Sequence, residues 1–396
     1  MLSREDNEIL TRVGPGTPMG DLMRQYWLPI LLSSELPAPD CNPIRVRLLG
    51  EPLIGFRDTT GKAALVAENC PHRGASLFYG RNEEGGLRCV YHGWKYDVQG
   101  RCVDMPNEPP ESNFKDKIKL VAYPCKEQNG IIWTYMGPRK ETPGFPELEW
   151  ALVPESHREV TPFVRECNWM QALEGDIDTS HTRFLHSRIN PQESQRNFGH
   201  YYKEKAPRFD VMDTDYGILI GAKSRVDDRR EYWRISQFVM PIFPMFPPSG
   251  RAFVPSHVWI PMDDVTTLVW SVRWHPTRPL GDEVRPGGFG GPGEYLPPST
   301  DAAGAWRMKA NASNDYLIDY EAQKTKRFSG VPTIALQDQA MTCSMGAISD
   351  RTKEHLGTTD MAIINARRRL IDAAKALRDH GTTPPGVDNP EMFRVR

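Results

Sequence analysis

The first thirty residues space their apolar side chains three to four positions apart, which is typical of short amphipathic helices. In the segment TPMGDLMRQYWLP, the apolar side chains from Leu22 to Trp27 follow this spacing. Thr17 precedes them and is a residue type that favours a helix start. We therefore predict short helices within residues 1–30.

Between residues 44 and 138 the pattern changes to short apolar runs separated by turn-forming residues. The run IRVRLLGEPLIGFRD predicts a hairpin with its turn at Gly50–Pro52. The run LRCVYHGWKYDVQGRCVDM predicts two strands with a turn at Gln99–Gly100, and NGIIWTYMG predicts one more. Together they predict an all-β unit of roughly 100 residues, a usual domain size. A linker rich in Pro and Gly follows at 137–150.

The remainder mixes helical and strand patterns. Residues 168–187, 305–327 and 360–379 have helical spacing, whereas 216–226, 230–240, 256–262 and 266–275 are strand-like and rich in aromatic residues. Residues 276–298 are dense in Gly and Pro and predict a long loop. The chain thus predicts an all-β domain at 44–140, with residues 1–43 and 141–396 forming an α+β domain.

Composition narrows the class of protein. The chain has 396 residues, with 49 Lys and Arg against 51 Asp and Glu, so its formal net charge of −2 argues against a nucleic-acid partner. No apolar run reaches the roughly 18 residues of a membrane span. The start MLSREDNEIL lacks the apolar core of a secretory signal, so we expect a cytoplasmic protein. Its seven cysteines, an odd number, argue against a disulfide framework.

Two short segments combine cysteine with histidine: Cys70-Pro-His72-Arg-Gly and Cys89-Val-Tyr-His92-Gly-Trp. A structural zinc site takes four such ligands, but its common spacing places Cys with Cys and His with His. A Rieske [2Fe-2S] cluster has two cysteines on one iron and two histidines on the other, which two parallel Cys–His loops supply directly. The sequence therefore favours the Rieske cluster, with a zinc site as the alternative. A chance pairing of core cysteines with unrelated histidines is improbable.

A second group of candidate ligands lies in NWMQALEGDIDTSHTRFLHSR, where Asp178, His181 and His186 follow one another closely. On a regular helix, residues five apart point about 140° away from each other. His181 and His186 can share a metal only where the helix ends, widens or contains a π-type turn, so we predict a distortion there. Two histidines and one carboxylate form the facial triad of Fe(II) oxygenases. The simpler alternative is that the histidines lie on the surface and that Asp176 and Asp178 are charges at a helix N-terminus, which the helix dipole favours.

With both groups present, the chain resembles the Rieske non-haem iron aromatic-ring-hydroxylating oxygenases. The resemblance implies an antiparallel Rieske domain and a helix-grip catalytic domain, a curved antiparallel sheet with helices. It implies that His181 and His186 bind the mononuclear Fe(II). Asp178 would instead connect an iron histidine to the cluster histidine His92 of a neighbouring subunit. Family members usually carry Asn where this chain has Glu174, a departure that we attribute to the phthalate-type branch.

The third iron ligand in this family lies far along the chain. Asp338 in IALQDQAMTCSMG is our candidate, because an unpaired carboxylate among these apolar residues would be costly and a metal removes that cost. A capped or salt-bridged Asp338 is the alternative. The competing carboxylates are Asp315, Asp319, Glu321, Asp350 and Asp360.

The segments NEILTRVGPGTPMGDLMRQYWLP, GRNEEGGLRCVYHGWKYDVQGRCVDMPNEP and LEGDIDTSHTRFLHS look like the oxygenase component (α-subunit) of phthalate 4,5-dioxygenase and its relatives. The resemblance implies O2-dependent cis-dihydroxylation of an aromatic carboxylate, or alternatively O-demethylation of a methoxylated aromatic acid. It implies a homotrimer or stacked-trimer hexamer. It also implies a separate NADH-dependent flavin/iron–sulfur reductase, and the chain has no GxGxxG motif after a predicted strand for binding NADH itself.

An aromatic carboxylate calls for an apolar slot and a cation, a role to which arginine is suited. Among Arg183, Arg208, Arg225 and Arg234, we favour Arg208 and Arg234, in APRFDV and YWRISQF. Phe243, Met245 and Phe246 are candidate pocket walls. Two other functions stay open: a pure electron-transfer Rieske protein, and a zinc-bound structural module.

Overall fold

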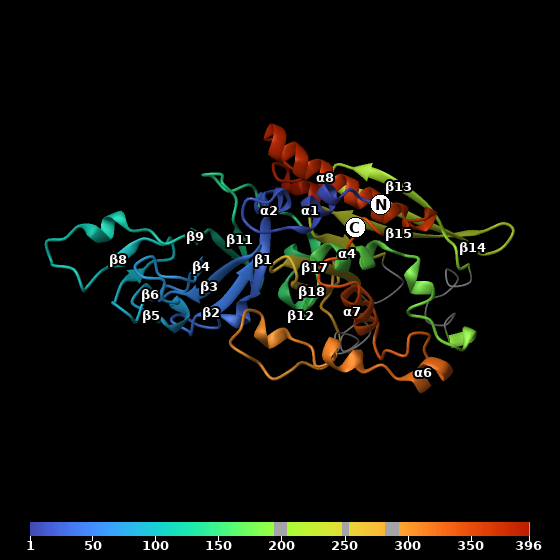
Figure 1. The fold of residues 1–396 in the computed structure, drawn as a ribbon, viewed down its shortest axis with the longest axis horizontal. Coiled ribbons are helices and arrows are strands. Elements are labelled where there is room, and N and C mark those ends of the chain that lie inside the picture. Colours follow the sequence, from blue (N-terminus) through green and yellow to red (C-terminus); the bar gives the residue numbers. More distant parts are fainter. Residues whose placement is uncertain (194–203, 248–252, 282–292, 396) are drawn as a thin grey trace.

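The computed structural model describes residues 1–193, 204–247, 253–281 and 293–395. Small antiparallel sheets form one end of the molecule, and a large sheet with helices packed on it forms the other (Figure 1). No helix in the described ranges is long and apolar enough to cross a membrane.

The three small sheets are formed by residues 27–135. One has the order β1-β11-β10, from Trp27–Leu32, Ile131–Tyr135 and Cys125–Gln128. The second has the order β2-β3-β4-β9, from Ile44–Leu48, Glu51–Arg57, Ala63–Ala67 and Ala122–Tyr123. The third has the order β5-β6-β7-β8, from Arg81–Glu83, Gly86–Arg88, Lys95–Tyr96 and Cys102–Asp104. All of their pairings are antiparallel.

The first predicted hairpin forms, but its turn lies earlier than predicted. Leu48 pairs with Glu51, so Leu49 and Gly50 make a two-residue turn, and Pro52 already belongs to β3. Leu49 has φ +49° and Gly50 has φ +81°. Two left-handed residues give a turn whose twist matches that of the flanking strands.

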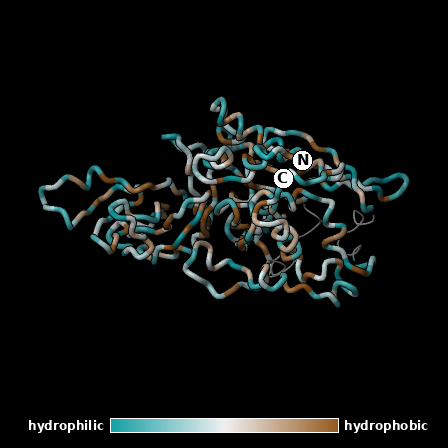
Figure 2. Tube along the Cα trace, viewed as in Figure 1, coloured by the Kyte–Doolittle hydropathy of each residue, from teal (hydrophilic) through white to brown (hydrophobic). Residues whose placement is uncertain are grey.

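The large sheet has the order β12-β18-β17-β16-β15-β14-β13, and its neighbours are all antiparallel. Its strands are β12 (Arg158–Arg165), β13 (Arg208–Thr214), β14 (Gly217–Arg225), β15 (Glu231–Val239), β16 (Phe243–Met245), β17 (Val254–Pro261) and β18 (Thr267–Trp274). The loop that joins β14 to β15 projects from the molecule and is strongly hydrophilic (Figure 2).

Helices cover one face of this sheet, which we call the inner face. They include α4 (Trp169–Ile177) and α8 (Met361–His380), and α7 (Ile334–Ser344) packs against α4. The chain also forms α1 (Arg4–Thr11), α2 (Pro18–Arg24), α3 (Glu149–Leu152) and α6 (Tyr320–Thr325). The Thr17 side chain caps α2 by accepting a hydrogen bond from the Gly20 amide, as predicted.

Two predicted helices are shorter than expected. The helix predicted at 168–187 ends at Ile177. The region 305–327 contains only short 3-10 turns and the six-residue α6, because Asp315, Tyr316 and Leu317 adopt left-handed backbone angles. Of the predicted loop at 276–298, residues 282–292 lie outside the described residues, and its described flanks form neither helix nor strand apart from one bridge at Tyr295.

Two hydrophobic cores stabilise the chain. The smaller core contains thirteen buried residues between Ile54 and Leu120, including Cys70, Cys89 and Trp94. The larger core joins the big sheet to the helices and to β1 and β11. The fold is thus an antiparallel Rieske-type unit joined to a sheet-and-helix unit, as the sequence predicts.

Candidate metal centres

The two Cys–His segments form loops with the same backbone hydrogen bonds. The Gly74 amide donates to the Cys70 carbonyl and the Gly93 amide to the Cys89 carbonyl, both at 2.9 Å. The amide of each cysteine in turn donates to the carbonyl five residues later. Gly74 has φ +77° and Gly93 has φ +82°, a conformation that favours glycine. The two loops are therefore built as a matched pair.

These loops place two sulfurs inside and two imidazoles near the surface. Cys70 and Cys89 are 2% and 3% exposed. The ring centroids of His72 and His92 lie 4.4 Å apart, and the His72 ring stacks on Trp94 at 4.4 Å. Within the described part of the chain, the buried Nδ1 atom of His72 has no hydrogen-bond partner. A metal ligand bond would satisfy that atom.

The donors fit a cluster better than a single zinc ion. Among the described residues, the one group of three His, Cys, Asp or Glu donors whose ligand atoms all lie within 4.8 Å is elsewhere in the chain. Ligands that bind one zinc ion at 2.0–2.3 Å would lie within this 4.8 Å limit of one another, and the two cysteines and two histidines do not form such a group. Burial raises the pKa of the Cys70 thiol, so its thiolate needs a metal partner. The more widely spaced ligand atoms of Cys70, Cys89, His72 and His92 therefore fit a two-iron cluster.

The compact group consists of His181, His186 and Asp338. Helix α4 ends at Ile177, and a 3-10 turn spans His181–Arg183. This break is the distortion predicted from the five-residue spacing, and it brings the two histidine ring centroids to 5.0 Å. Helix α7 supplies Asp338, whose Oδ1 atom lies 3.4 Å from His181 Nε2 and 3.2 Å from His186 Nε2.

Neighbouring groups fix how the two imidazoles face. The Gln337 amide nitrogen donates to the Val331 carbonyl at 2.9 Å, so its Oε1 atom accepts from His186 Nδ1 at 2.7 Å. The Asp178 carboxylate lies 3.3 Å from His181 Nδ1 and also accepts from the Ser180 amide. Both Nδ1 atoms therefore carry a proton, and both Nε2 atoms face Asp338 as the atoms available to bind a metal.

This arrangement concentrates negative and electron-rich atoms at one point. Burial opposes the charged form of His181, but the carboxylates of Asp178 and Asp338 outweigh it and raise the pKa of His181 to about 10. Burial likewise opposes the charged form of Asp338, but the two imidazoles hold its pKa below the usual range. A cation is strongly favoured here, and two histidines with one carboxylate fit non-haem Fe(II).

The competing carboxylates lie elsewhere. Asp319 caps α6, Asp350 binds Thr352 and Lys353, and Asp360 accepts from the Gly357 amide. Asp315 and Glu321 are exposed and are absent from the compact group. Two polar contacts in this domain could not be predicted from the sequence: Gln337 with His186, and Asp176 with His257. Asp176 accepts from His257 Nδ1 at 2.9 Å and from Trp259 Nε1 at 2.6 Å.

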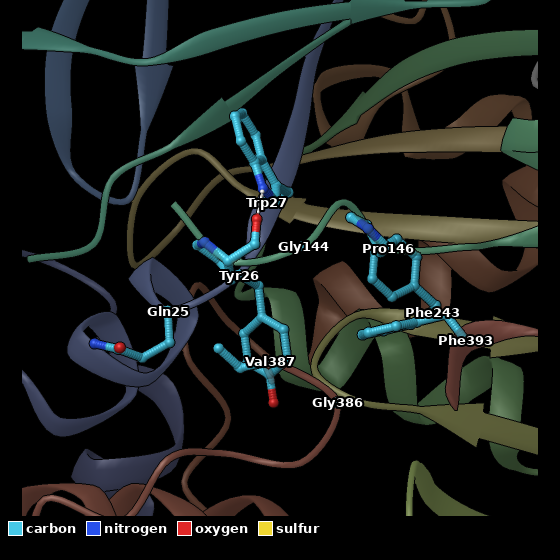
Figure 3. A pocket seen from close by; sticks show the side chains of 10 residues that line it. Gln25, Tyr26, Trp27, Gly144, Pro146, Phe243, Gly386, Val387 and Phe393 are labelled. Atoms are coloured by element: carbon cyan, nitrogen blue, oxygen red, sulfur yellow. Dashed lines mark hydrogen bonds between the residues drawn. The ribbon is translucent and has the colours of Figure 1, made fainter. Parts of the chain in front are cut away.

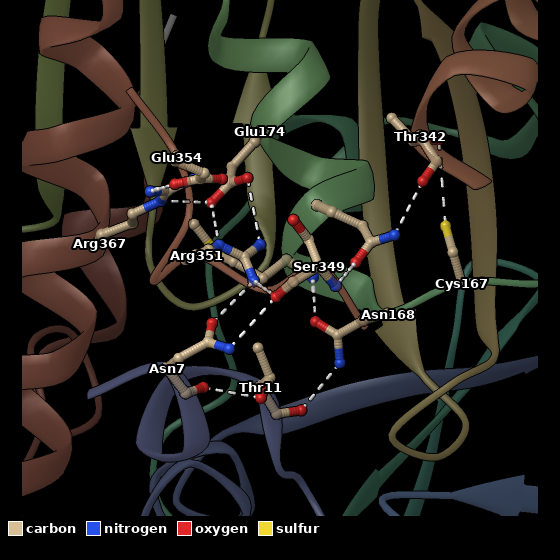
Figure 4. A network of polar contacts seen from close by, with 12 residues as sticks. Asn7, Thr11, Cys167, Asn168, Glu174, Thr342, Ser349, Arg351, Glu354 and Arg367 are labelled. Carbon is tan, nitrogen blue, oxygen red and sulfur yellow. Dashed lines mark hydrogen bonds and ion pairs between the residues drawn. The ribbon is translucent and has the colours of Figure 1, made fainter. Parts of the chain in front are cut away.

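Glu174 forms buried ion pairs that stabilise the fold. Its carboxylate binds both Arg351 and Arg367 in the protein interior, and Arg367 also binds Glu354 (Figure 4). Burial opposes its charge, but the two guanidinium groups outweigh this and lower the pKa of Glu174. The acid therefore ties α4 to α8 rather than contacting the iron-ligand candidates.

The sheet register separates the candidate substrate arginines. Ala222 pairs with Arg234, and Ser224 lies two residues further on the same face. The Ser224 hydroxyl accepts from the buried Arg183 at 2.7 Å, so this is the inner face. Arg208 pairs with Lys223 and therefore lies on the opposite face, where it is exposed. This placement favours Arg234 over Arg208 as a substrate contact.

The other candidates divide in the same way. Arg225 is exposed and pairs with Asp228. Phe246 contacts His257 on the inner face, with ring centroids 5.1 Å apart, whereas Phe243 lies in a crevice on the other side. That crevice, lined also by Tyr26, Trp27 and Phe393, contains none of the iron-ligand candidates (Figure 3).

Comparisons with known proteins agree with this geometry. Residues 26–124 match the model of the Rieske [2Fe-2S] domain, and residues 134–394 match the model described as LigXa C-terminal domain like. The chain is 43% identical over 404 residues to the 3-chlorobenzoate-3,4-dioxygenase oxygenase subunit of Comamonas testosteroni, covering 99% of this chain and 93% of that protein.

Two further relatives cover nearly all of the chain. Identity is 38% over 398 residues to the phthalate 4,5-dioxygenase oxygenase subunit of Pseudomonas putida, covering 96% of this chain and 87% of that protein. Identity is 34% over 406 residues to the 5,5'-dehydrodivanillate O-demethylase oxygenase subunit of a Sphingobium species, covering 100% and 84%.

Among solved structures, the terminal oxygenase of carbazole 1,9a-dioxygenase from Nocardioides aromaticivorans IC177 has the same fold. It aligns with a TM-score of 0.61 at 17% identity over 94% of this chain and 98% of that chain. The fold of both domains, the two candidate metal sites and the full-length relatives all indicate the same family. The chain therefore belongs to the Rieske non-haem iron oxygenases, as an oxygenase α-subunit.

Proposed function

We propose that this protein is a terminal oxygenase that cis-dihydroxylates an aromatic carboxylate. The convergence of His181 Nε2, His186 Nε2 and Asp338 Oδ1 on one point carries the proposal, because it matches a facial triad with open positions. The similarity to oxygenase subunits named for 3-chlorobenzoate and phthalate supports an aromatic acid as the substrate.

We assign these three residues as the ligands of mononuclear Fe(II), and Cys70, His72, Cys89 and His92 as those of the Rieske cluster. When bound, these centres supply stored electrons and the binding and activation of O2 beside the substrate. Gln337 and Asp178 hold the protons on the two Nδ1 atoms, which keeps the Nε2 lone pairs available as ligands.

Asp178 has a second role in this proposal. It is partly exposed, with 21% of its side chain accessible, so one side of the carboxylate can meet another imidazole. In a homotrimer that partner is His92 of a neighbouring copy, and Asp178 connects the two metal sites by hydrogen bonds. A stacked-trimer hexamer keeps the same contact.

We propose that Arg234 pairs with the substrate carboxylate. It lies on the inner face of the sheet, where Phe246 provides an apolar surface for a ring. A guanidinium group binds a carboxylate through two parallel hydrogen bonds, which would also fix the ring orientation.

O-demethylation of a methoxylated aromatic acid is the second candidate. The full-length similarity to an O-demethylase oxygenase subunit favours it. The same iron ligands serve both reactions, so the position of the substrate relative to the iron decides between them. An NADH-dependent flavin/iron–sulfur reductase as electron donor and a cytoplasmic location complete the proposal.

Turnover under ¹⁸O2, followed by mass spectrometry, tests it. The reaction contains NADH, a phthalate-type reductase and a panel of phthalates, halobenzoates and methoxybenzoates. A dihydrodiol with two labelled oxygens supports the dioxygenase. Formaldehyde and a demethylated phenol identify the second candidate. A fully loaded protein that converts no panel member would contradict the proposed substrate class.

A further inference from the structure

Two cysteines outside the cluster lie side by side in the catalytic domain. Cys167 directly precedes Asn168, the residue that caps α4, and it is fully buried. Cys343 lies near the end of α7 and is half-buried. Cys167 Sγ lies 4.0 Å from the hydroxyl of Thr342, the residue before Cys343 (Figure 4), and the Asn168 amide donates to the Ala347 carbonyl at 2.8 Å. The two thiols are close enough to affect each other's pKa. The fold therefore forms a thiol pair from two distant segments.

A strained backbone segment supports this pair. Asp315, Tyr316 and Leu317 have φ values of +49°, +53° and +56°, which non-glycine residues rarely adopt, least of all consecutively. Tyr316 is buried, and its phenol lies close enough to Cys343 for each group to affect the pKa of the other. Strained segments persist where the surrounding structure needs them, often at functional sites.

The environment gives the two thiols different chemistry. The interaction with Cys167 lowers the pKa of Cys343, burial opposes this, and Tyr316 and Arg165 lower it further. The interaction with Cys343 and burial raise the pKa of Cys167. Cys343, which is half-buried, is therefore the thiol that solvent can reach and the one whose pKa is lowered, and Cys167 lies fully buried behind it.

We propose that Cys343 and Cys167 form a peroxide-reactive dithiol, with Cys343 attacking the oxidant and Cys167 resolving the product. The oxidant is hydrogen peroxide, which two-electron reduction of O2 without substrate oxidation yields. The Cys343 sulfur forms an S–O bond while the O–O bond breaks, leaving a sulfenic acid and one water. The Cys167 sulfur then displaces the second water, with its own proton, to form the disulfide. Two thiols lose two electrons, and peroxide becomes two waters.

The disulfide would connect the segments that carry the proposed iron ligands. Helix α7 holds Asp338 five residues before Cys343, and α4 leads from Cys167 toward His181. Oxidation would therefore lock the end of α7 to the start of α4. The proposal rests on these contacts and is independent of which aromatic acid the enzyme oxidises.

Peptide mapping of the holoenzyme tests this proposal directly. Trypsin releases residues 166–183 and 328–351 as separate peptides, each with one cysteine. After treatment with a few equivalents of hydrogen peroxide and alkylation of the remaining thiols, we expect these peptides to appear disulfide-linked. Dithiothreitol should separate them. The linkage is scored apart from methionine oxidation, because Met341 and Met345 are 43% and 54% exposed in the same peptide.

Variants distinguish the two roles. Cys167→Ser should trap Cys343 as a sulfenic acid, detected as a dimedone adduct on peptide 328–351. Cys343→Ser should abolish the link and leave Cys167 unmodified. Cys125→Ser is the matched control and should keep the link, because burial raises the pKa of Cys125 to about 12. The visible spectrum of the cluster shows that each variant is folded.

Three outcomes would overturn the proposal. The first is a wild-type protein whose Cys343 stays alkylatable at peroxide doses that already oxidise Met341. The second is a Cys167→Ser variant with no dimedone adduct. The third is oxidation of Cys125 at the same rate as Cys343.

Discussion

The Nε2 atoms of His181 and His186 lie 3.2 Å apart, and both lie within 3.4 Å of Asp338 Oδ1. Each Nδ1 atom carries a proton because Asp178 and Gln337 accept from these atoms. The two Nε2 atoms therefore face each other next to a carboxylate and repel one another unless a proton or a metal ion lies between them, which is also why the pKa of His181 is raised. The side chains therefore define a cation site through their hydrogen bonds as well as their positions.

Replacing Asp338 with alanine should remove the mononuclear iron and leave the Rieske cluster intact. Iron content should fall from about three to about two per chain, and substrate oxidation should be lost while the visible cluster spectrum remains. Metal analysis combined with absorbance measures both. Asp228→Ala is the control, since its side chain is 97% exposed. Full turnover by Asp338→Ala at normal iron content would exclude Asp338 as a ligand.

Replacing Gln337 with leucine should weaken iron binding roughly 10- to 100-fold, because His186 would lose the acceptor that fixes its tautomer. Titration of the iron-depleted protein with Fe(II), followed by activity, gives the affinity. Gln339→Leu is a matched control on the same helix, since Gln339 contacts the Val164 carbonyl instead. Equal affinities in the two variants would contradict this role for Gln337.

Replacing Glu174 with glutamine should destabilise the fold by about 3–5 kcal/mol at pH 7, because two buried guanidinium groups would lose their carboxylate. Since the pKa of Glu174 is lowered on folding, its stabilisation is complete above its ordinary pKa of 4.5 and is lost as pH falls through the lower folded value.

Denaturant unfolding at several pH values measures this effect. The difference between wild type and Glu174→Gln should shrink below about pH 4.5. Glu294→Gln is the control, because its pair with Lys309 is on the surface, where water and salt screen it and leave little effect on stability. A difference that grows toward acid pH would be the wrong sign for this explanation.

Replacing Arg234 with alanine should raise KM for the aromatic acid by about 10- to 100-fold. This is the effect of losing a hydrogen bond to a charged group, which contributes about 1.5–3 kcal/mol. Arg208→Ala should leave KM unchanged, because Arg208 lies on the opposite face of the sheet. Steady-state kinetics on both variants provides the comparison. A larger effect from Arg208→Ala would reverse the assignment.

Local patterns in the sequence predicted much of this molecule. The two Cys–His segments, a distorted helix near His181 and His186, and Asp338 as a candidate ligand could all be proposed without a structure, because metal-ligand chemistry restricts residue type and spacing. The strands β14, β15, β17 and β18 also followed from their aromatic-rich patterns.

Other features depend on contacts between distant segments. Strand β12 was missed because Pro162 interrupts its pattern, which an edge strand tolerates. Helix 305–327 was predicted too long because nothing local shows that residues 315–317 turn left-handed. Arg208 and Arg234 looked equivalent until the register of β13, β14 and β15 placed them on opposite faces.

The matched loops at Cys70 and Cys89 have a consequence for how the enzyme matures. Each loop closes through its own backbone hydrogen bonds, and its glycine already holds the required angle. Trp94 stacks on His72, and its indole nitrogen bonds to Asn107, so the aromatic side of the receptacle is also fixed by protein contacts. We therefore expect protein contacts to hold both loops in this shape, so that inserting the cluster needs little rearrangement of their backbone.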